Sequence, residues 1–275
     1  MNHTIGSAGS HATREVAAWV PPLARLGYAA KGVVYGLVGG IAIRAALASG
    51  DAEGASGALA SLADDQGGRL MLLLIALGLL AHVLWRAVQA LLDPEHAKVD
   101  GKRIAMRLFY ALSGVVYGSL AYTAWQLGRG QGNGNGNGSG NGQEVWVARL
   151  LEQPLGAWLV MIGGVGVMAY GAHQLFKAWR GDVNRRMAPP GQEVSRGVRL
   201  VGRIGTAARG VVLLPIGWFV FGAGRHYRAS EASDTGEVLQ MLEPGWLLAA
   251  VGIGLLAYGL HQVAKAMYRR IAPPS

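Results

Sequence analysis

The chain has 275 residues, of which 51% are hydrophobic and only 15% are charged, against roughly 25% charged residues in soluble domains. It contains no cysteine, which excludes disulfides, thiolate catalysis and cysteine-built metal sites. The net charge of +9 reflects where the basic residues lie along the chain and calls for no nucleic-acid partner. This composition is typical of a protein that crosses a membrane several times.

Six segments are apolar enough, or nearly so, to cross a bilayer as α-helices of about 20 residues. They are roughly 24–48, 70–92, 106–127, 155–179, 203–223 and 245–267. The fifth contains Pro215, and we expect this proline to break the helix. The N-terminal stretch lacks the apolar core of a cleaved signal peptide. The fold class predicted is therefore an all-α, polytopic membrane protein with six transmembrane helices.

The direction of the spans follows from the basic residues, because cytoplasmic loops carry an excess of Lys and Arg. Most of the 25 Lys and Arg residues fall on the side that holds the two termini and the loops near positions 93–105 and 180–202. We therefore expect both termini to be cytoplasmic.

Two sequence patterns recur three times. The stretch 24–36, ARLGYAAKGVVYG, returns at 106–118 as MRLFYALSGVVYG and at 202–214 as GRIGTAARGVVLL. Likewise 166–178, GVMAYGAHQLFKA, matches 254–266 and, more loosely, 78–90. The chain thus reads as three tandem helical hairpins, all the same way up, related by a pseudo-threefold axis along the membrane normal.

These patterns divide the chain into an N-tail and three membrane units. The ranges are 1–22 for the tail, 23–93 for unit one, 103–180 for unit two and 199–271 for unit three. Each unit also contains a short amphipathic stretch before its second helix, typical of an interfacial helix. These stretches are 57–63, 145–151 and 236–242. A Gly/Asn tract at 128–142 predicts a flexible loop within unit two.

The repeats resemble a bacterial membrane family known as domain of unknown function 1206. The resemblance rests on the ARxGYAAKGVVY opening at 24–35 and on the AYxxHQ or HxxWR endings at 169–174, 257–262 and 82–86. It covers about 23–270 and implies an integral bacterial membrane protein with no established biochemistry. Unit three departs from the pattern at Thr206, Leu213 and Leu214.

Basic residues at repeated positions near the predicted cytoplasmic ends form one candidate site. Its members are Arg25, Lys31, Arg107, Arg203 and Arg209. They serve as topology anchors, or they form a ring of cations that holds anionic lipid headgroups. The glycine row Gly32, Gly36 and Gly40, with Gly114 and Gly118 in unit two, predicts close helix packing.

A second candidate is a polar path. Its members are His173, Gln174, His261 and Gln262. These side chains satisfy one another between helices, line a path for ions or protons, or, through the two histidines, bind haem. The spans contain no metal-ligand cluster and no carboxylate to assist a nucleophile. We therefore expect no catalytic residue, no metal and no cofactor.

The sequence favours a non-enzymatic scaffold or lipid-interacting module, with membrane lipids as partners and no nucleic acid. The alternative is a small channel or transporter with a path along the pseudo-threefold axis. The substrate, the protein partners and the oligomeric state are not legible in the sequence.

Overall fold

A computed structural model of the chain describes residues 5–48, 55–63, 66–91, 101–131, 142–184, 187–188, 191–233, 235–242 and 245–269. Six long helices run through these residues. They are α1 (Ile5–Ala48), α3 (Gln66–Leu91), α4 (Gly101–Gly128), α6 (Gly156–Arg180), α7 (Gln192–His226) and α9 (Gly245–Tyr268). Most of the Gly/Asn tract lies outside the described residues.

Five of the six long helices are long and apolar enough to cross a membrane. The stretches that qualify are Pro21–Leu47, Gln66–Leu91, Gly156–Arg180, Gln192–His226 and Gly245–Tyr268. Helix α4 has 28 residues and sufficient length, but it is not among the stretches that qualify within the described residues. The described part of the chain is thus that of a multi-pass membrane protein, with five candidate spans and a sixth long helix.

Pro215 does not break its helix, contrary to the expectation from the sequence. Helix α7 continues without interruption through Pro215 as far as His226. A proline inside a helix removes one backbone hydrogen bond and costs about 3 kcal/mol. Helix α7 packs along α6 and also contacts α9, and these neighbours hold it in one piece.

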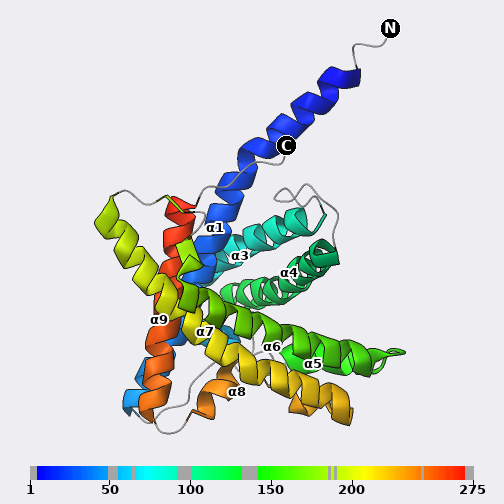
Figure 1. Cartoon of the computed structure of the whole chain (residues 1–275), viewed down its shortest axis with the longest axis vertical. Helices are drawn as coiled ribbons and strands as arrows, with labels where there is room; N and C mark the ends of the chain where they lie inside the picture. The colour runs from blue at the N-terminus through cyan, green and yellow to red at the C-terminus, as the bar shows by residue number, and fades with distance from the viewer. Residues whose placement is uncertain are drawn as a thin grey trace.

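The most extensive helix contacts join one unit to the next. Helix α3 of unit one pairs with α4 of unit two, and α6 of unit two pairs with α7 of unit three. Helix α1 pairs with α9, so the first and last long helices of the chain lie side by side (Figure 1). Within a unit, α1 contacts α3 less extensively, as α7 contacts α9. The helix contacts within the hairpins seen in the sequence are therefore less extensive than those between units.

Glycine allows two of these pairs to approach closely. On α1, a Cβ added to Gly32 would lie 2.8 Å from the Gly259 carbonyl oxygen, and one added to Gly39 would lie 2.5 Å from the Leu256 nitrogen. Gly164 and Gly217 meet in the same way between α6 and α7. The predicted packing row is wrong at Gly40, whose added Cβ meets nothing within 4 Å. Gly39 takes its place because the helix turns that neighbouring position toward α9.

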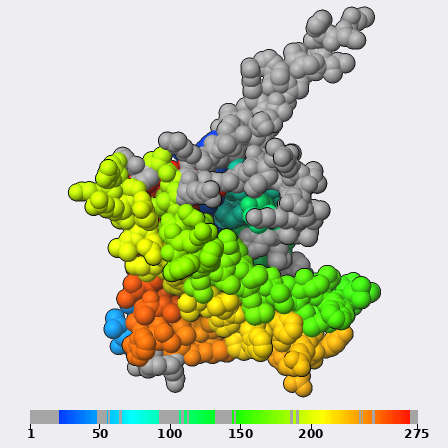
Figure 2. Space-filling model, in the orientation of Figure 1, coloured from blue at the N-terminus to red at the C-terminus, as the bar shows by residue number. Residues whose placement is uncertain are grey.

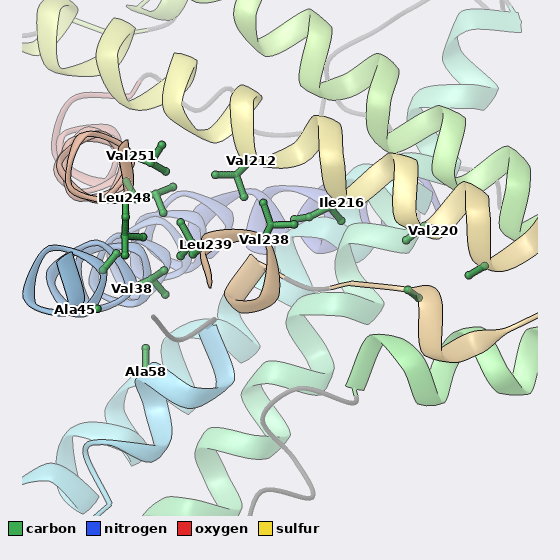
Figure 3. Packing of buried hydrophobic residues seen from close by; sticks show 14 of the residues in the cluster. Val38, Ala45, Ala58, Val212, Ile216, Val220, Val238, Leu239, Leu248 and Val251 are labelled. Atoms are coloured by element: carbon green, nitrogen blue, oxygen red, sulfur yellow. The ribbon is translucent and has the colours of Figure 1, made fainter. Parts of the chain in front are cut away.

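Three short helices lie at one end of the bundle, as their amphipathic patterns predict. They are α2 (Ala55–Ala60), α5 (Gly142–Leu151) and α8 (Thr235–Gln240). Two 3-10 turns, Asp182–Asn184 after α6 and Ala229–Glu231 after α7, lie in other loops. The apolar residues Leu59, Val147 and Leu239 of the three short helices are buried. Figure 3 shows Val238 and Leu239 of α8 among residues of α1, α7 and α9. These helices close an apolar core at that end of the molecule.

Candidate functional site: two cations among tyrosines

Lys31 of α1 and Arg209 of α7 converge inside the bundle. The Lys31 ammonium lies 4.6 Å from the centre of the Tyr117 ring on α4. Both cations face the same two rings: Lys31 lies 5.9 Å from Tyr35 and from Tyr258, and Arg209 lies 5.5 Å from Tyr35 and 5.0 Å from Tyr258. The structure thus brings together two of the five basic residues singled out in the sequence.

The guanidinium of Arg209 is also hydrogen-bonded to tyrosines. It donates to the Tyr258 hydroxyl at 2.5 Å and to the Tyr170 hydroxyl of α6 at 3.4 Å. We call Lys31, Arg209, Tyr35, Tyr117, Tyr170 and Tyr258 the cation–tyrosine cluster. Its members come from α1, α4, α6, α7 and α9, so one site draws on all three units.

The cluster carries positive charge with no carboxylate to balance it. In the five candidate spans and in α4 the only acidic residue is Glu193, in the first turn of α7. Lys31 is only 3% exposed. Removing an ion from water costs several kcal/mol, whereas a cation over an aromatic ring gains about 0.5 to 2 kcal/mol. The tyrosines therefore offset only part of that cost, and an anionic group close to both cations would offset much of the rest.

The other three predicted basic residues lie apart from the cluster. Arg107 donates to the carbonyl oxygens of Ala90 and Leu91 at the end of α3, at 2.5 and 2.6 Å. Arg203 donates to Ala178 and Trp179 at the end of α6, at 2.9 and 3.4 Å. Arg25 is exposed. The bonds of Arg107 and Arg203 satisfy carbonyl groups that a helix end leaves open, which gives both residues a structural role.

The four residues of the predicted polar path divide between two environments. Gln174 and Gln262 are buried, and each donates to the tyrosine one turn earlier, Tyr170 at 3.2 Å and Tyr258 at 3.0 Å. They therefore support the cluster. His261 is buried against Gly202 of α7, whereas His173 is exposed on α6. The structure does not bring the two histidines together.

The four tyrosines are the part of the site that sequence reasoning missed. A signal for them was present in the repeats, since Tyr35 and Tyr117 occupy one repeated position, and Tyr170 and Tyr258 another. In unit one, Arg86 of α3 occupies the repeated position that Gln174 and Gln262 hold in units two and three. Its guanidinium stacks on Tyr110, 5.2 Å from the ring centre. Tyrosine in a membrane protein is usually assigned to the interface, so the repeated tyrosines were not recognised as part of a site inside the bundle.

An all-helical bundle with several membrane-length helices and charged side chains turned inward defines a polytopic membrane protein. Residues 26–93, 108–181 and 204–269 each match the family described as Domain of Unknown Function (DUF1206). The chain belongs to that family, as the repeats indicated. It is 28% identical over 267 residues to YxxB, an uncharacterized protein of Bacillus subtilis (strain 168), covering 94% of each chain. No solved structure matches the chain significantly.

Proposed function

We propose that this protein is a non-enzymatic, lipid-interacting module of the bacterial plasma membrane that holds an anionic group at the cation–tyrosine cluster. The observation that carries the proposal is the burial of Lys31 beside Arg209, where Glu193 in the first turn of α7 is the only acidic residue of the surrounding helices. Ionisable residues inside a membrane are costly and usually serve a function. The chemistry shared by all suitable ligands is that of a phosphate-like anion.

The proposal includes six spans, with α4 as the third, and both termini in the cytoplasm. The support is the length of α4, the absence of acidic residues in it and the excess of basic residues in the loops on the side of the termini. We expect a fluorescent reporter that matures only in the cytoplasm to be bright when fused after Ser275. A dark fusion together with an N-tail that an external reagent does not label means an odd number of spans. A dark fusion together with a labelled N-tail means the opposite orientation. Either result overturns this topology.

Ligand binding is tested with purified protein in a mild detergent. We expect anionic phospholipid to co-purify and to be seen in a native mass spectrum. Inorganic phosphate added to delipidated protein is expected to raise the melting temperature if a free anion is the natural ligand, since a ligand that binds only the folded state stabilises it. Stabilisation by phosphatidylglycerol but not by phosphate identifies the lipid as the source.

Two variants give that experiment its control. Lys31→Met and Arg209→Met remove the cations of the cluster, and we expect either of them to reduce bound anionic lipid several-fold. Arg25→Met removes an exposed charge from the same helix as Lys31 and is expected to leave the amount of bound anionic lipid unchanged. Equal lipid in the Lys31→Met variant, the Arg209→Met variant and the parent contradicts the proposed function.

A second candidate is a small anion channel or transporter with a path along a pseudo-threefold axis. Its support is a chain of hydrogen bonds that leads from Arg209 through Tyr258 and Gln262 to Lys265, near the end of α9. The Lys265 ammonium donates to Oε1 of the Gln262 side chain at 3.0 Å. Anion flux into vesicles that disappears in the Lys31→Met variant favours this candidate over a lipid-binding module.

A further inference from the structure

The two helices of unit two are separated, whereas those of units one and three pack together. Equivalent glycines show the difference. A Cβ added to Gly78 of α3 would lie 2.5 Å from the Ala30 Cβ of α1, and one added to Gly254 of α9 would lie 2.2 Å from the Ala208 Cβ of α7. Gly166 of α6 holds the same repeated position, but its added Cβ meets nothing within 4 Å.

A second repeated position agrees with the first. Trp85 of α3 packs with Ala24 of α1, and His261 of α9 lies against Gly202 of α7; both side chains are 1% exposed. His173, their equivalent on α6, is exposed. The exposure of His173 therefore has a structural cause, the missing contact between the described residues of α4 and α6.

The sequence of α4 accounts for this separation. Unit one has Ala24, Gly27 and Ala30 along the face that meets its second helix, and unit three has the equally small Gly202, Gly205 and Ala208. Unit two has Met106, Phe109 and Leu112 at the same positions. A Cβ at Gly27 or Gly205 would already lie 2.6 or 2.3 Å from the facing backbone. The approach in units one and three therefore leaves no room for a large side chain at these two positions.

The boundary between α4 and α6 leads to the cation–tyrosine cluster. The ring nearest to Lys31 belongs to Tyr117 of α4, and one hydroxyl bonded to Arg209 belongs to Tyr170 of α6. Arg209 and Tyr170 are only partly buried. In its most apolar stretch α6 is 22% buried, against 39–50% for the other four candidate spans, and Figure 2 shows α6, in green, on the surface.

We propose that the boundary between α4 and α6 is a lateral entry from the bilayer, through which the phosphate of an anionic phospholipid reaches Lys31 and Arg209. This inference rests on the proposed function and names the ligand and its route. Charge complementarity supports it: the entry is apolar at the surface, with Val165 and Ile162 exposed on α6, and cationic at its depth. A phospholipid has this same order of chemistry, from apolar chains to a negative headgroup.

A single bulky residue placed in the entry tests the route. Gly166→Trp puts an indole into open space on α6, and we expect bound anionic phospholipid, measured by native mass spectrometry, to fall several-fold. Gly40→Trp is the matched control, because an added Cβ at Gly40 also meets nothing within 4 Å, and Gly40 belongs to α1. Its lipid content is expected to equal that of the parent. Parental lipid content in Gly166→Trp overturns the inference.

A second variant closes the entry in place of filling it. Met106→Ala, Phe109→Gly and Leu112→Ala together give α4 the small residues of unit one. His173→Cys supplies the only cysteine of the chain and is introduced both into the parental protein and into this variant. We expect a maleimide to label the cysteine in the parental background but not in the closing variant. Bound lipid in the closing variant is expected to fall several-fold. Persistent labelling shows that these residues do not set the separation, and protection with unchanged lipid shows another route; each result overturns the inference.

The outcomes separate this inference from the proposed function. If Lys31→Met leaves the bound lipid unchanged, the proposed function fails. If Lys31→Met lowers the bound lipid but Gly166→Trp and the closing variant do not, the cluster binds the anion and the lateral entry alone is refuted.

Discussion

Gly39→Ala is expected to lower the melting temperature of the purified protein by several degrees. The added methyl group would lie 2.5 Å from the Leu256 nitrogen and 2.6 Å from the Gly252 carbonyl oxygen. Both atoms belong to the backbone of α9, which moves only if the two helices separate. Overpacking a well-packed interface costs typically 1 to 3 kcal/mol, and Gly164→Ala, which would lie 2.5 Å from the Phe221 nitrogen, is expected to have a similar effect between α6 and α7.

The neighbouring glycines provide the controls for both substitutions. Added Cβ atoms at Gly40 and Gly163 meet nothing within 4 Å, so Gly40→Ala and Gly163→Ala are expected to be neutral or slightly stabilising, because alanine is favoured over glycine in a helix by about 1 kcal/mol. Each pair compares the same chemical change at adjacent positions. If all four variants melt at one temperature, helix contact at these glycines does not limit stability.

Lys31→Met is expected to raise the melting temperature of delipidated protein. The substitution keeps an unbranched side chain of similar length within reach of Tyr117 but removes a buried ammonium. Burying an ion with no charged partner costs several kcal/mol, more than the about 2 kcal/mol lost with the strongest cation–ring contacts. Such a gain in stability, joined to a loss of lipid binding, is the pattern of a residue kept for function.

Arg25→Met controls for the removal of a positive charge from α1. Arg25 is exposed, and we expect its loss to change the melting temperature little, as exposed charges contribute about 1 kcal/mol or less. A lower melting temperature in Lys31→Met than in Arg25→Met means that the tyrosine rings more than offset the cost of burying Lys31. The cluster is then a structural element.

Much of the fold follows from the sequence, because apolar length and internal repeats are properties of the chain itself. Five of the six predicted spans coincide with helices that meet the requirements of a membrane crossing, and the short amphipathic stretches form α2, α5 and α8. The family resemblance is confirmed over all three units. The periodicity of apolar residues shows which residues share a helix face, and this is enough to locate the long apolar helices and the short amphipathic ones.

Which helix packs against each helix face could not be predicted in the same way. The repeats of the sequence favour hairpins within a unit, but the most extensive helix contacts lie between units, from α1 to α9, from α3 to α4 and from α6 to α7. The cluster was found in part: Lys31 and Arg209 were identified as basic residues at repeated positions, while the tyrosines around them required knowledge of how five helices meet. Pro215 was misjudged because a local rule for proline takes no account of neighbouring helices that restrain α7.

The pairing of α1 with α9 has a consequence for how the protein is made. A ribosome delivers the helices in order, so α3 with α4 and α6 with α7 can each associate soon after the second member enters the bilayer. Helix α1 enters first, yet the surface around Gly32 and Gly39 finds its partner only when the last helix arrives. Assembly therefore ends by joining the two ends of the chain, and a protein interrupted before α9 leaves its first helix without its main neighbour.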